Sequence, residues 1–269
     1  MTCVTVLGHT NLKPNMISTM SSESALSPAR PGSLGQQALG AGPDAPLGDL
    51  LRGRRSVRGY RPDAVPADVI RDVLADAILA PSSMNTQPWK FHVLSGEVLD
   101  RIREENTRLM LAGAPIQRDV TVAERYEGVH RDRQVDIAKR LFGAMGIARE
   151  DQDARLDWTM RGFRQFDAPV SIVIAHDRSL EAVSPIAHFD LGAVVHALVL
   201  SAWSRGLGTV INSQGIMQGA AVRREAGIPD DHVIFTAVAM GYPDEDFAAN
   251  HVRSARESVD DVTRFVGFD

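Results

Sequence analysis

The sequence predicts one α+β domain that begins near residue 46, and three observations support this fold class. Apolar residues recur at helical spacing between residues 66 and 78. Two runs rich in β-branched residues, 170–175 and 233–240, have the length and composition of buried strands. Finally, residues 190–203 are apolar nearly all round a helix, and such a helix must be covered on every side by its own core or by a second subunit.

The N-terminal segment differs in composition from the rest of the chain. Residues 1–45 are rich in Ser, Gly, Pro and Ala and show almost no apolar periodicity. Such a segment cannot bury enough apolar surface to offset the entropy lost on ordering. We therefore predict a flexible arm over residues 1–45 and one folded domain over residues 46–269. Met16 and Met20 leave the true start of the protein open.

The helices and strands before residue 112 follow from apolar spacing and from Pro and Gly punctuation. The predicted elements are helices over 47–52, 66–80 and 97–111, and a strand over 89–94. Residues 112–166 are also helical in pattern but strongly charged, with large apolar side chains along them. Two interpretations of 112–166 are equally supported: surface helices whose large side chains are simply core, or a lid over a ligand pocket.

Beyond residue 166 the pattern alternates between buried strands and helices. The predicted elements are strands over 170–175, 209–211 and 233–240, and helices over 190–203 and 220–226. A last apolar patch lies at residues 265–268.

Composition excludes several classes of function. The chain has 269 residues and a formal net charge of -5, which argues against a nucleic-acid partner because phosphate binding needs a concentrated basic face. Cys3 is the only cysteine, so an intrachain disulfide and a thiolate metal cluster are impossible. No apolar run reaches the length needed to cross a bilayer, and the N-terminus has no secretory signal pattern, so we expect no membrane contact and a cytoplasmic location.

Two polar stretches have the chemistry of a binding site. Residues 80–89 read A-P-S-S-M-N-T-Q-P-W, an uncharged set of hydroxyl and amide groups that suits the edge of a flat heteroaromatic ligand. Upstream, Arg54, Arg55 and Arg58 offer planar guanidinium groups that match a phosphate. Each stretch alone is more simply a turn or a solvated basic segment. Together they favour a site for a ligand that has a flat ring and a phosphate.

The order of motifs resembles the FMN-dependent nitroreductase family, over residues 46–269. The motifs are R-R-S-V-R, then A-P-S-S-M-N-T-Q-P-W-K-F, G-L-G-T-V-I-N-S-Q-G, V-A-M-G-Y-P and R-S-A-R. The segment 112–166 resembles the branch that contains nitrobenzoate and dinitroaniline-herbicide reductases. The resemblance implies a three-layer fold with a mixed central sheet flanked by helices, and an intertwined homodimer in which 190–203 lies at the interface and a strand over 265–268 reaches onto the partner.

The resemblance also implies which residues hold FMN. Arg54 and Ser56 would hold its phosphate and ribityl chain with Arg256, and Arg253 would replace a lysine that some members have there. Arg58 would approach the N1–O2 edge of the ring. The other subunit would supply the loop that faces the flavin, and the Gln-Gly pair falls where the family often has Glu-Gly. The implied cofactor contacts, with Arg55 added from the basic cluster, are Arg54, Arg55, Ser56, Arg58, Pro81, Ser82, Ser83, Asn85, Gln87, Gln214, Gly215, Arg253 and Arg256.

The implied activity is the reduction of nitroaromatic compounds with NADH or NADPH. In such enzymes the flavin carries the redox chemistry, so no catalytic residue and no metal ligand are predicted, and nitroso and hydroxylamine products would form in a ping-pong cycle. The same scaffold also supports flavin reductases, enone reductases and dehalogenases. A flavin-binding sensor without turnover, or a dimeric protein without a cofactor, remains an alternative of a different class.

Overall fold

The computed structural model describes residues 44–120, 126–181 and 185–268, all within one compact unit, Gln37–Asp269. Only the last two residues of the predicted arm fall in this part. The helices are α1 (Leu47–Gly53), α2 (Ala67–Ala77), α3 (Gly96–Leu111), α4 (Gly128–Ala144), α5 (Gln152–Phe163), α6 (Ile186–Ser204), α7 (Gly219–Ala226) and α8 (Val259–Val262). The strands are β1 (Trp89–Ser95), β2 (Val170–Asp177), β3 (Gly208–Ile211) and β4 (His232–Gly241).

These elements confirm the predicted α+β class and the predicted order. The four strands form one sheet in the order β1-β2-β4-β3, and every neighbouring pair of these strands is antiparallel. Parallel pairing is limited to isolated bridges outside the named strands, such as Ser56 with Thr209. The resemblance implied a sheet with both parallel and antiparallel pairing. Within the described residues, parallel pairing occurs only at such bridges.

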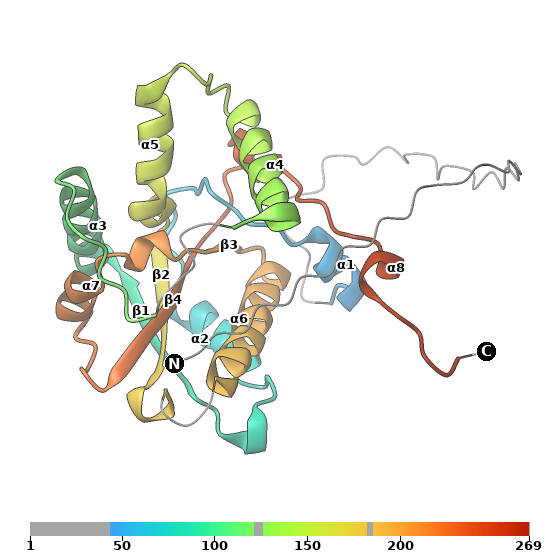
Figure 1. The fold of residues 1–269 in the computed structure, drawn as a ribbon. Coiled ribbons are helices and arrows are strands. Elements are labelled where there is room, and N and C mark those ends of the chain that lie inside the picture. The colour runs from blue at the N-terminus through green and yellow to red at the C-terminus, as the bar shows by residue number, and fades with distance from the viewer. Residues whose placement is uncertain (1–43, 121–125, 182–184, 269) are drawn as a thin grey trace, which may run out of the picture. The chain divides into compact units, whose positions relative to one another are not determined.

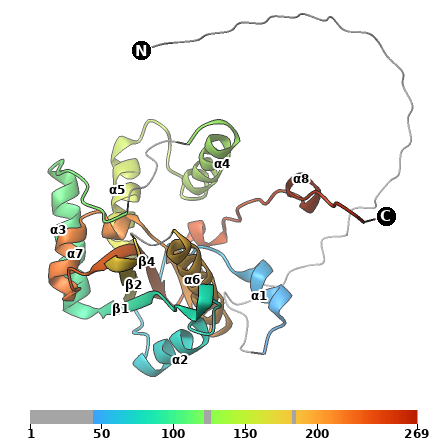
Figure 2. The same cartoon turned by 60° about the horizontal axis from the view of Figure 1, so that its bottom comes forward.

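Helices cover both faces of the sheet and give it three layers (Figures 1 and 2). On one face, α2 and α6 pack against strand residues such as Ile172 and Val238. On the other face, α3 and α7 pack against Val173 and Ala237. Successive residues of a strand point to opposite faces, so a strand covered on both sides is apolar at every position. This explains the continuous apolar runs in β2 and β4.

Helix α6 is the longest apolar element. Within the described residues it is the one helix that meets the length and hydropathy of a membrane span: it has 19 residues, and an 18-residue window within it has a mean hydropathy of 1.5. The expectation that no apolar stretch is long enough to cross a bilayer was therefore wrong. His188, Asp190 and His196 interrupt the apolar run in the sequence, but the mean hydropathy of the helix stays at the level of a membrane span. The helix packs on α2 and on the sheet, and Leu191, Val194 and Leu198 are fully buried there, as in the core helix of a globular domain.

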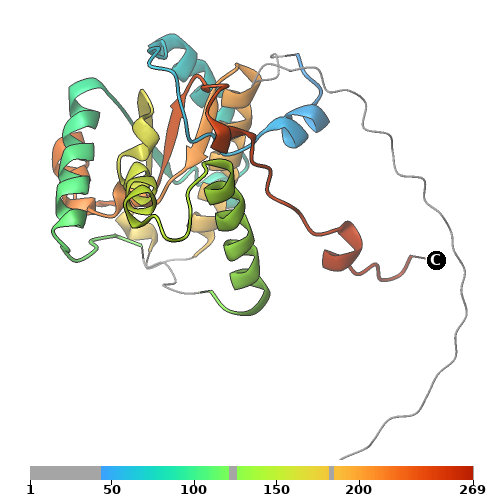
Figure 3. The ribbon, with the colours of Figure 1, turned by 90° about the horizontal axis from the view of Figure 1, so that it is seen from above.

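Two parts of the chain lie outside the three layers. Helices α4 and α5 lie at one end of the sheet, as Figure 3 shows from above. The C-terminal tail carries α8, whose start is fixed by a capping box between Ser258 and Asp261. Residues 265–268 form no strand within the single chain, and Phe265 and Phe268 are exposed. No strand of the described chain is paired with them. The strand expected on a partner subunit stays a prediction.

Candidate functional site

Arginines from the two ends of the domain meet beside α1. They line a cavity of about 330 Å³ whose walls come from α1 and the segment after it, from α4 and from the C-terminal tail. The residues that line it are Leu51, Arg52, Arg54, Arg55, Ser56, Arg58, Ile137, Val252, Arg253, Ser254 and Arg256. The structure therefore brings together the basic cluster and the distant arginine pair that the sequence analysis singled out.

The positive charge of this cavity is not neutralised within the described chain. None of Arg54, Arg55, Arg58, Arg253 and Arg256 forms an ion pair with a described carboxylate, and no described carboxylate lines the cavity. Burial, followed by repulsion from Arg253, lowers the pKa of Arg55 to about 10. Burial and repulsion from Arg256 likewise lower the pKa of Arg54. The cavity is thus suited to an anionic group.

Arg55 also has a nitrogen atom without a hydrogen-bond partner. Its Nε is buried and has no hydrogen-bond partner. Its guanidinium group lies over the ring of Trp203, near the end of α6, with 5.3 Å between the guanidinium carbon and the ring centroid. Stacking fixes the plane of the group and leaves its N–H donors available.

The backbone of Arg58 is held by a buried asparagine that sequence reasoning missed. Asn250 Oδ1 accepts hydrogen bonds from the N–H groups of Arg58 (2.7 Å) and Gly59 (3.1 Å), and Asn250 Nδ2 donates to the Gly59 carbonyl (2.8 Å). Burial lowers the pKa of Arg58, while Tyr60 acts in the opposite direction. The tail sequence around Asn250 gave no signal for this role, because a lone Asn in a turn usually satisfies only local groups.

An apolar cavity of about 340 Å³ adjoins the arginine cavity, and Arg54 and Ser56 line both. The walls of the apolar cavity come from α6, β3 and β4. The other lining residues are Gly192, Val195, His196, Val199, Thr209, Ile211, Phe235 and Thr236. A phosphate site and a space for an apolar ring therefore meet at Arg54 and Ser56.

The loop after α2 has a strained backbone. Met84, Asn85 and Gln87 have positive φ angles of 50°, 59° and 46°, which non-glycine residues rarely adopt. The loop is held by hydrogen bonds from the Gln87 N–H to Ser82 Oγ (3.0 Å) and from the Ser83 N–H to Asp190 Oδ2 (3.1 Å). Such strain persists where the surroundings fix it, and it often marks a functional segment.

Asp190 is a second residue whose role the sequence analysis missed. It is 2% exposed and is the only acidic residue of α6, where it anchors the loop through Ser83. The sequence contained a signal for this role, because a single carboxylate in an otherwise apolar helix needs a buried polar partner.

Within one chain, the loop and the arginine cavity lie at opposite ends of α6. Ser83 is held at Asp190, whereas Arg55 stacks on Trp203. Thirteen residues of helix between these contacts correspond to about 20 Å. Figure 1 shows α1 and the loop segment after α2 near different ends of α6. The structure therefore does not bring Pro81, Ser82, Ser83, Asn85 and Gln87 together with the arginines in a single chain.

Gln214 and Gly215 lie in a 3-10 turn after β3 and line neither cavity. The Gln214 N–H donates to Asn212 Oδ1 (3.0 Å), and the Gly215 carbonyl accepts from Asn106 Nδ2 (2.8 Å). A Cβ at Gly162 would lie 2.0 Å from Gln214 Oε1. The Gln214 side chain is therefore packed against α5.

Helix α5 connects the charged segment 112–166 to Arg58. Arg161 donates to the Arg58 carbonyl (3.1 Å) and lies over the ring of Phe247, which stacks on Trp158 with 6.5 Å between centroids. The apolar underside that a lid requires is present at these rings. The role of 112–166 as a lid stays a prediction.

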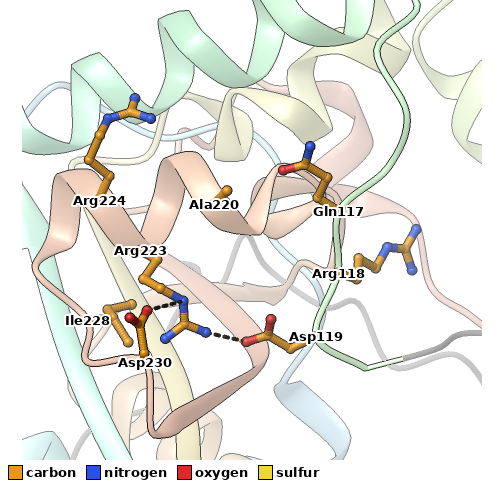
Figure 4. A pocket seen from close by; sticks show the side chains of 8 residues that line it. All are labelled: Gln117, Arg118, Asp119, Ala220, Arg223, Arg224, Ile228 and Asp230. Carbon is orange, nitrogen blue, oxygen red and sulfur yellow. Dashed lines mark hydrogen bonds and ion pairs between the residues drawn. The ribbon is translucent and has the colours of Figure 1, made fainter.

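A larger cavity of about 570 Å³ lies at α7 (Figure 4). Its chemistry differs from that of the arginine cavity, because Arg223 pairs with Asp119 at 2.6 Å and approaches Asp230 at 3.9 Å. These carboxylates neutralise the charge of Arg223, so we do not assign the main ligand site to this cavity.

Comparison with known proteins identifies the family of the chain. Residues 51–242 match the Nitroreductase family. The chain is 32% identical over 223 residues to a chloronitrobenzene nitroreductase of Comamonas testosteroni, covering 82% of this chain and 96% of that protein. It is 30% identical over 227 residues to a 4-nitrobenzoate reductase of Pseudomonas putida, covering 82% and 95%.

A solved structure gives the same result for the fold. The crystal structure of the FMN-dependent nitroreductase NfnB from Mycobacterium smegmatis in complex with NADPH aligns with a TM-score of 0.75 and 30% identity, covering 81% of this chain and 97% of that one. The region that the family model matches includes Arg54, Arg55 and Arg58, the strained loop and all four strands, whereas Arg253 and Arg256 lie beyond it. The chain belongs to the Nitroreductase family.

Proposed function

We propose that this protein reduces nitroaromatic compounds with electrons from NADH or NADPH through bound FMN. The observation that carries the proposal is the set of arginines around one cavity without a described counter-charge. It is supported by relatives named for chloronitrobenzene and 4-nitrobenzoate reduction and by a neighbour that is FMN-dependent and binds NADPH.

The residues present fit FMN. Its phosphate would relieve the repulsion between Arg55 and Arg253 and between Arg54 and Arg256, and would give the buried Arg55 Nε an acceptor nearby. The adjoining apolar cavity offers a place for a ring, with Ser56 at the junction of the two. We assign the phosphate to Arg54, Arg55, Arg253 and Arg256.

When bound, FMN supplies the hydride chemistry that links the nicotinamide to the nitro group. The protein's part is to bind, orient and exclude water. Arg58, fixed by Asn250, is the residue that we assign to stabilise the negative charge gained on reduction. A permanent cation held on a rigid backbone needs no reorganisation when that charge appears.

We propose that two copies of the chain complete each site. The loop 81–87 is about 20 Å of helix away from the arginines in its own chain, so only a partner's loop can approach them. The loop and the start of α6 also expose large apolar side chains: Met84 is 96% exposed, Leu79 80% and Phe189 74%. Apolar surface of this kind is typical of an interface, and Phe265 and Phe268 of the tail would bind across it.

The remaining assignments follow from this arrangement. We propose that 112–166 acts as a lid, because α5 contacts the Arg58 backbone and presents aromatic rings beside it. The substrate preference would then depend on this segment. We keep 46–269 as the bounds of the FMN-binding domain; residues 1–43 of the predicted arm lie outside the described residues. Because NAD(P)H is an intracellular reductant, the proposed reaction would take place in the cytoplasm.

The visible spectrum of the purified full-length protein tests the proposal directly. We expect flavin absorbance, bleaching of that absorbance on titration with NADH or NADPH without oxygen, and its return when 4-nitrobenzoate or a chloronitrobenzene is added. A protein that is reduced but not reoxidised by any nitroaromatic compound would instead be a flavin-binding sensor or a reductase for other acceptors. A colourless preparation that cannot be reconstituted with FMN would exclude the proposal.

A further inference from the structure

Two histidines and a glutamate meet where β2 ends and α6 begins. His176 is next to the last residue of β2, Glu181 follows a 3-10 turn, and His188 lies in the first turn of α6. Glu181 Oε1 lies 2.9 Å from His176 Nε2 and 3.0 Å from His188 Nε2. The three atoms all lie within 4.8 Å of one another.

The hydrogen bonding of His176 makes this contact unusual. The ring is fully buried, and its Nδ1 lies 3.0 Å from the Asp177 carbonyl oxygen. A carbonyl can only accept, so Nδ1 carries the proton, and Nε2 of a neutral ring then presents a lone pair. This lone pair lies next to a carboxylate oxygen, and Nε2 has no properly aligned hydrogen-bond partner. Two acceptors this close repel each other, and a cation bound between them would relieve that repulsion.

We propose that His176, Glu181 and His188 bind one zinc ion. Two imidazole nitrogens and one carboxylate oxygen form a ligand set that zinc uses when its fourth position is left to water. The Nδ1–H of His176, directed at a carbonyl oxygen, is also the outer contact that fixes a metal-binding histidine.

The distances require only a modest adjustment. Tetrahedral ligand atoms at zinc bond lengths of about 2.0–2.2 Å lie about 3.3–3.5 Å apart. The two Glu181–histidine distances are already close to this value, and the two imidazoles have to approach from at most 4.8 Å. The side chains of His188 and Glu181 are 35% and 40% exposed, so they can move and an ion can enter.

The ion would tie the end of β2 to the first turn of α6. His188 also packs on Phe235 of β4, with 4.9 Å between ring centroids, so the site lies against the sheet. Two residues further along α6, Asp190 anchors the strained loop through Ser83. Zinc would therefore stiffen the part of α6 that holds the loop. None of its three ligands lines the arginine cavity or the apolar cavity, so the site does not depend on the proposed reaction.

Calorimetric titration of the full-length protein with zinc chloride, after removal of metals with a chelator, tests the proposal. We expect one ion per chain. Glu181→Gln keeps the shape of the side chain and removes its charge, and His188→Ala removes one ligand; both positions are partly exposed, so the variants should fold. Each should weaken zinc binding more than about 100-fold, since even outer contacts of a ligand are worth about 10–100-fold. His130→Ala, at an exposed site on α4, is the matched control and should bind as the wild type does.

Thermal denaturation gives a second readout. Zinc should raise the midpoint of the wild type and of His130→Ala but not that of the two ligand variants. Absence of stoichiometric binding, or binding that survives in both ligand variants, overturns the proposal; a second proton on His176 would then explain the contact. The flavin spectrum should be the same in all four proteins, so a failure of the proposed reaction would be recognised separately.

Discussion

At the scale of single residues, the site depends on cations whose charge no described acid balances. In an ordinary surface cluster, arginines alternate with carboxylates, as Arg164 does with Asp157 and Asp167. Around the arginine cavity the acceptors are instead backbone carbonyls: Arg253 donates to Arg52 and Gly53. Carbonyls orient a guanidinium group without cancelling its charge. The cluster is therefore set up for an anion that arrives from outside the chain.

Arg58→Ala should slow the reduction of bound FMN by NADPH about 100- to 1,000-fold, by analogy with the loss of one donor that stabilises developing charge. Stopped-flow absorbance measures this rate. Arg61→Ala is the control, because Arg61 pairs with Asp63 on the surface and stacks on Tyr242 outside both cavities. An Arg58→Ala protein with the wild-type flavin content and reduction rate would remove the role that we assign to this residue.

Arg256→Gln should have opposite effects on the protein with and without FMN. Without FMN, removing the charge relieves its repulsion of Arg54, so the thermal midpoint should stay equal or rise. With FMN, a charged hydrogen bond worth about 1.5–3 kcal/mol is lost, so the dissociation constant should rise roughly 10- to 100-fold. Fluorescence titration of FMN and thermal denaturation of the flavin-free protein measure the two effects. A drop in the midpoint without FMN would contradict the repulsion.

At the scale of elements, a close approach between β3 and the segment after α1 positions the arginines. The Val57 N–H donates to the Thr209 carbonyl (2.9 Å), and a Cβ at Gly208 would lie 2.6 Å from Val57 Cγ2. Val57 is fully buried, so it has no room to move away. Only glycine at position 208 allows the segment that carries Ser56 and Arg58 to lie this close to the sheet.

Gly208→Ala should therefore lower the free energy of unfolding by about 1–3 kcal/mol through overpacking and should weaken FMN binding as well. Denaturant unfolding and FMN titration measure both. Gly143→Ala is the matched control: Gly143 lies in α4 with no atom near its added Cβ, and alanine there should stabilise the helix by about 0.5–1 kcal/mol. If Gly208→Ala unfolds like Gly143→Ala, the close approach has no role.

The elements themselves could be predicted from the sequence, because apolar periodicity depends on local spacing. The helix through Val73 and the strand through Val173 appear where the pattern placed them. The backbone of the loop could not be predicted, since Met84 and Asn85 adopt positive φ without a glycine to signal it. Their conformation depends on Asp190, a contact across more than one hundred residues.

At the scale of the whole molecule, the sequence could identify the two halves of the site but not their separation. Arg55 and Ser83 belong to motifs that read as parts of one site, yet they contact α6 thirteen residues apart, at Trp203 and Asp190. Sequence spacing gives no measure of that distance. The tail is a second example. Residues 265–268 read as a strand in the sequence, but no strand of the described chain pairs with them, and Phe265 and Phe268 are exposed. The partner copy proposed above would supply the surface that covers them.

Co-expression of two inactive variants tests whether the site is shared. Arg58→Ala damages the arginine side, and Asn85→Trp places a bulky ring on the exposed loop. In a two-fold dimer containing one of each, one site carries both defects and the other carries none, so random pairing should restore about a quarter of the wild-type activity. Co-expression of Arg58→Ala with a chain that carries both substitutions is the control and should restore nothing. If each chain held a complete site of its own, the first pair would stay as inactive as the control, because every chain would keep its own defect.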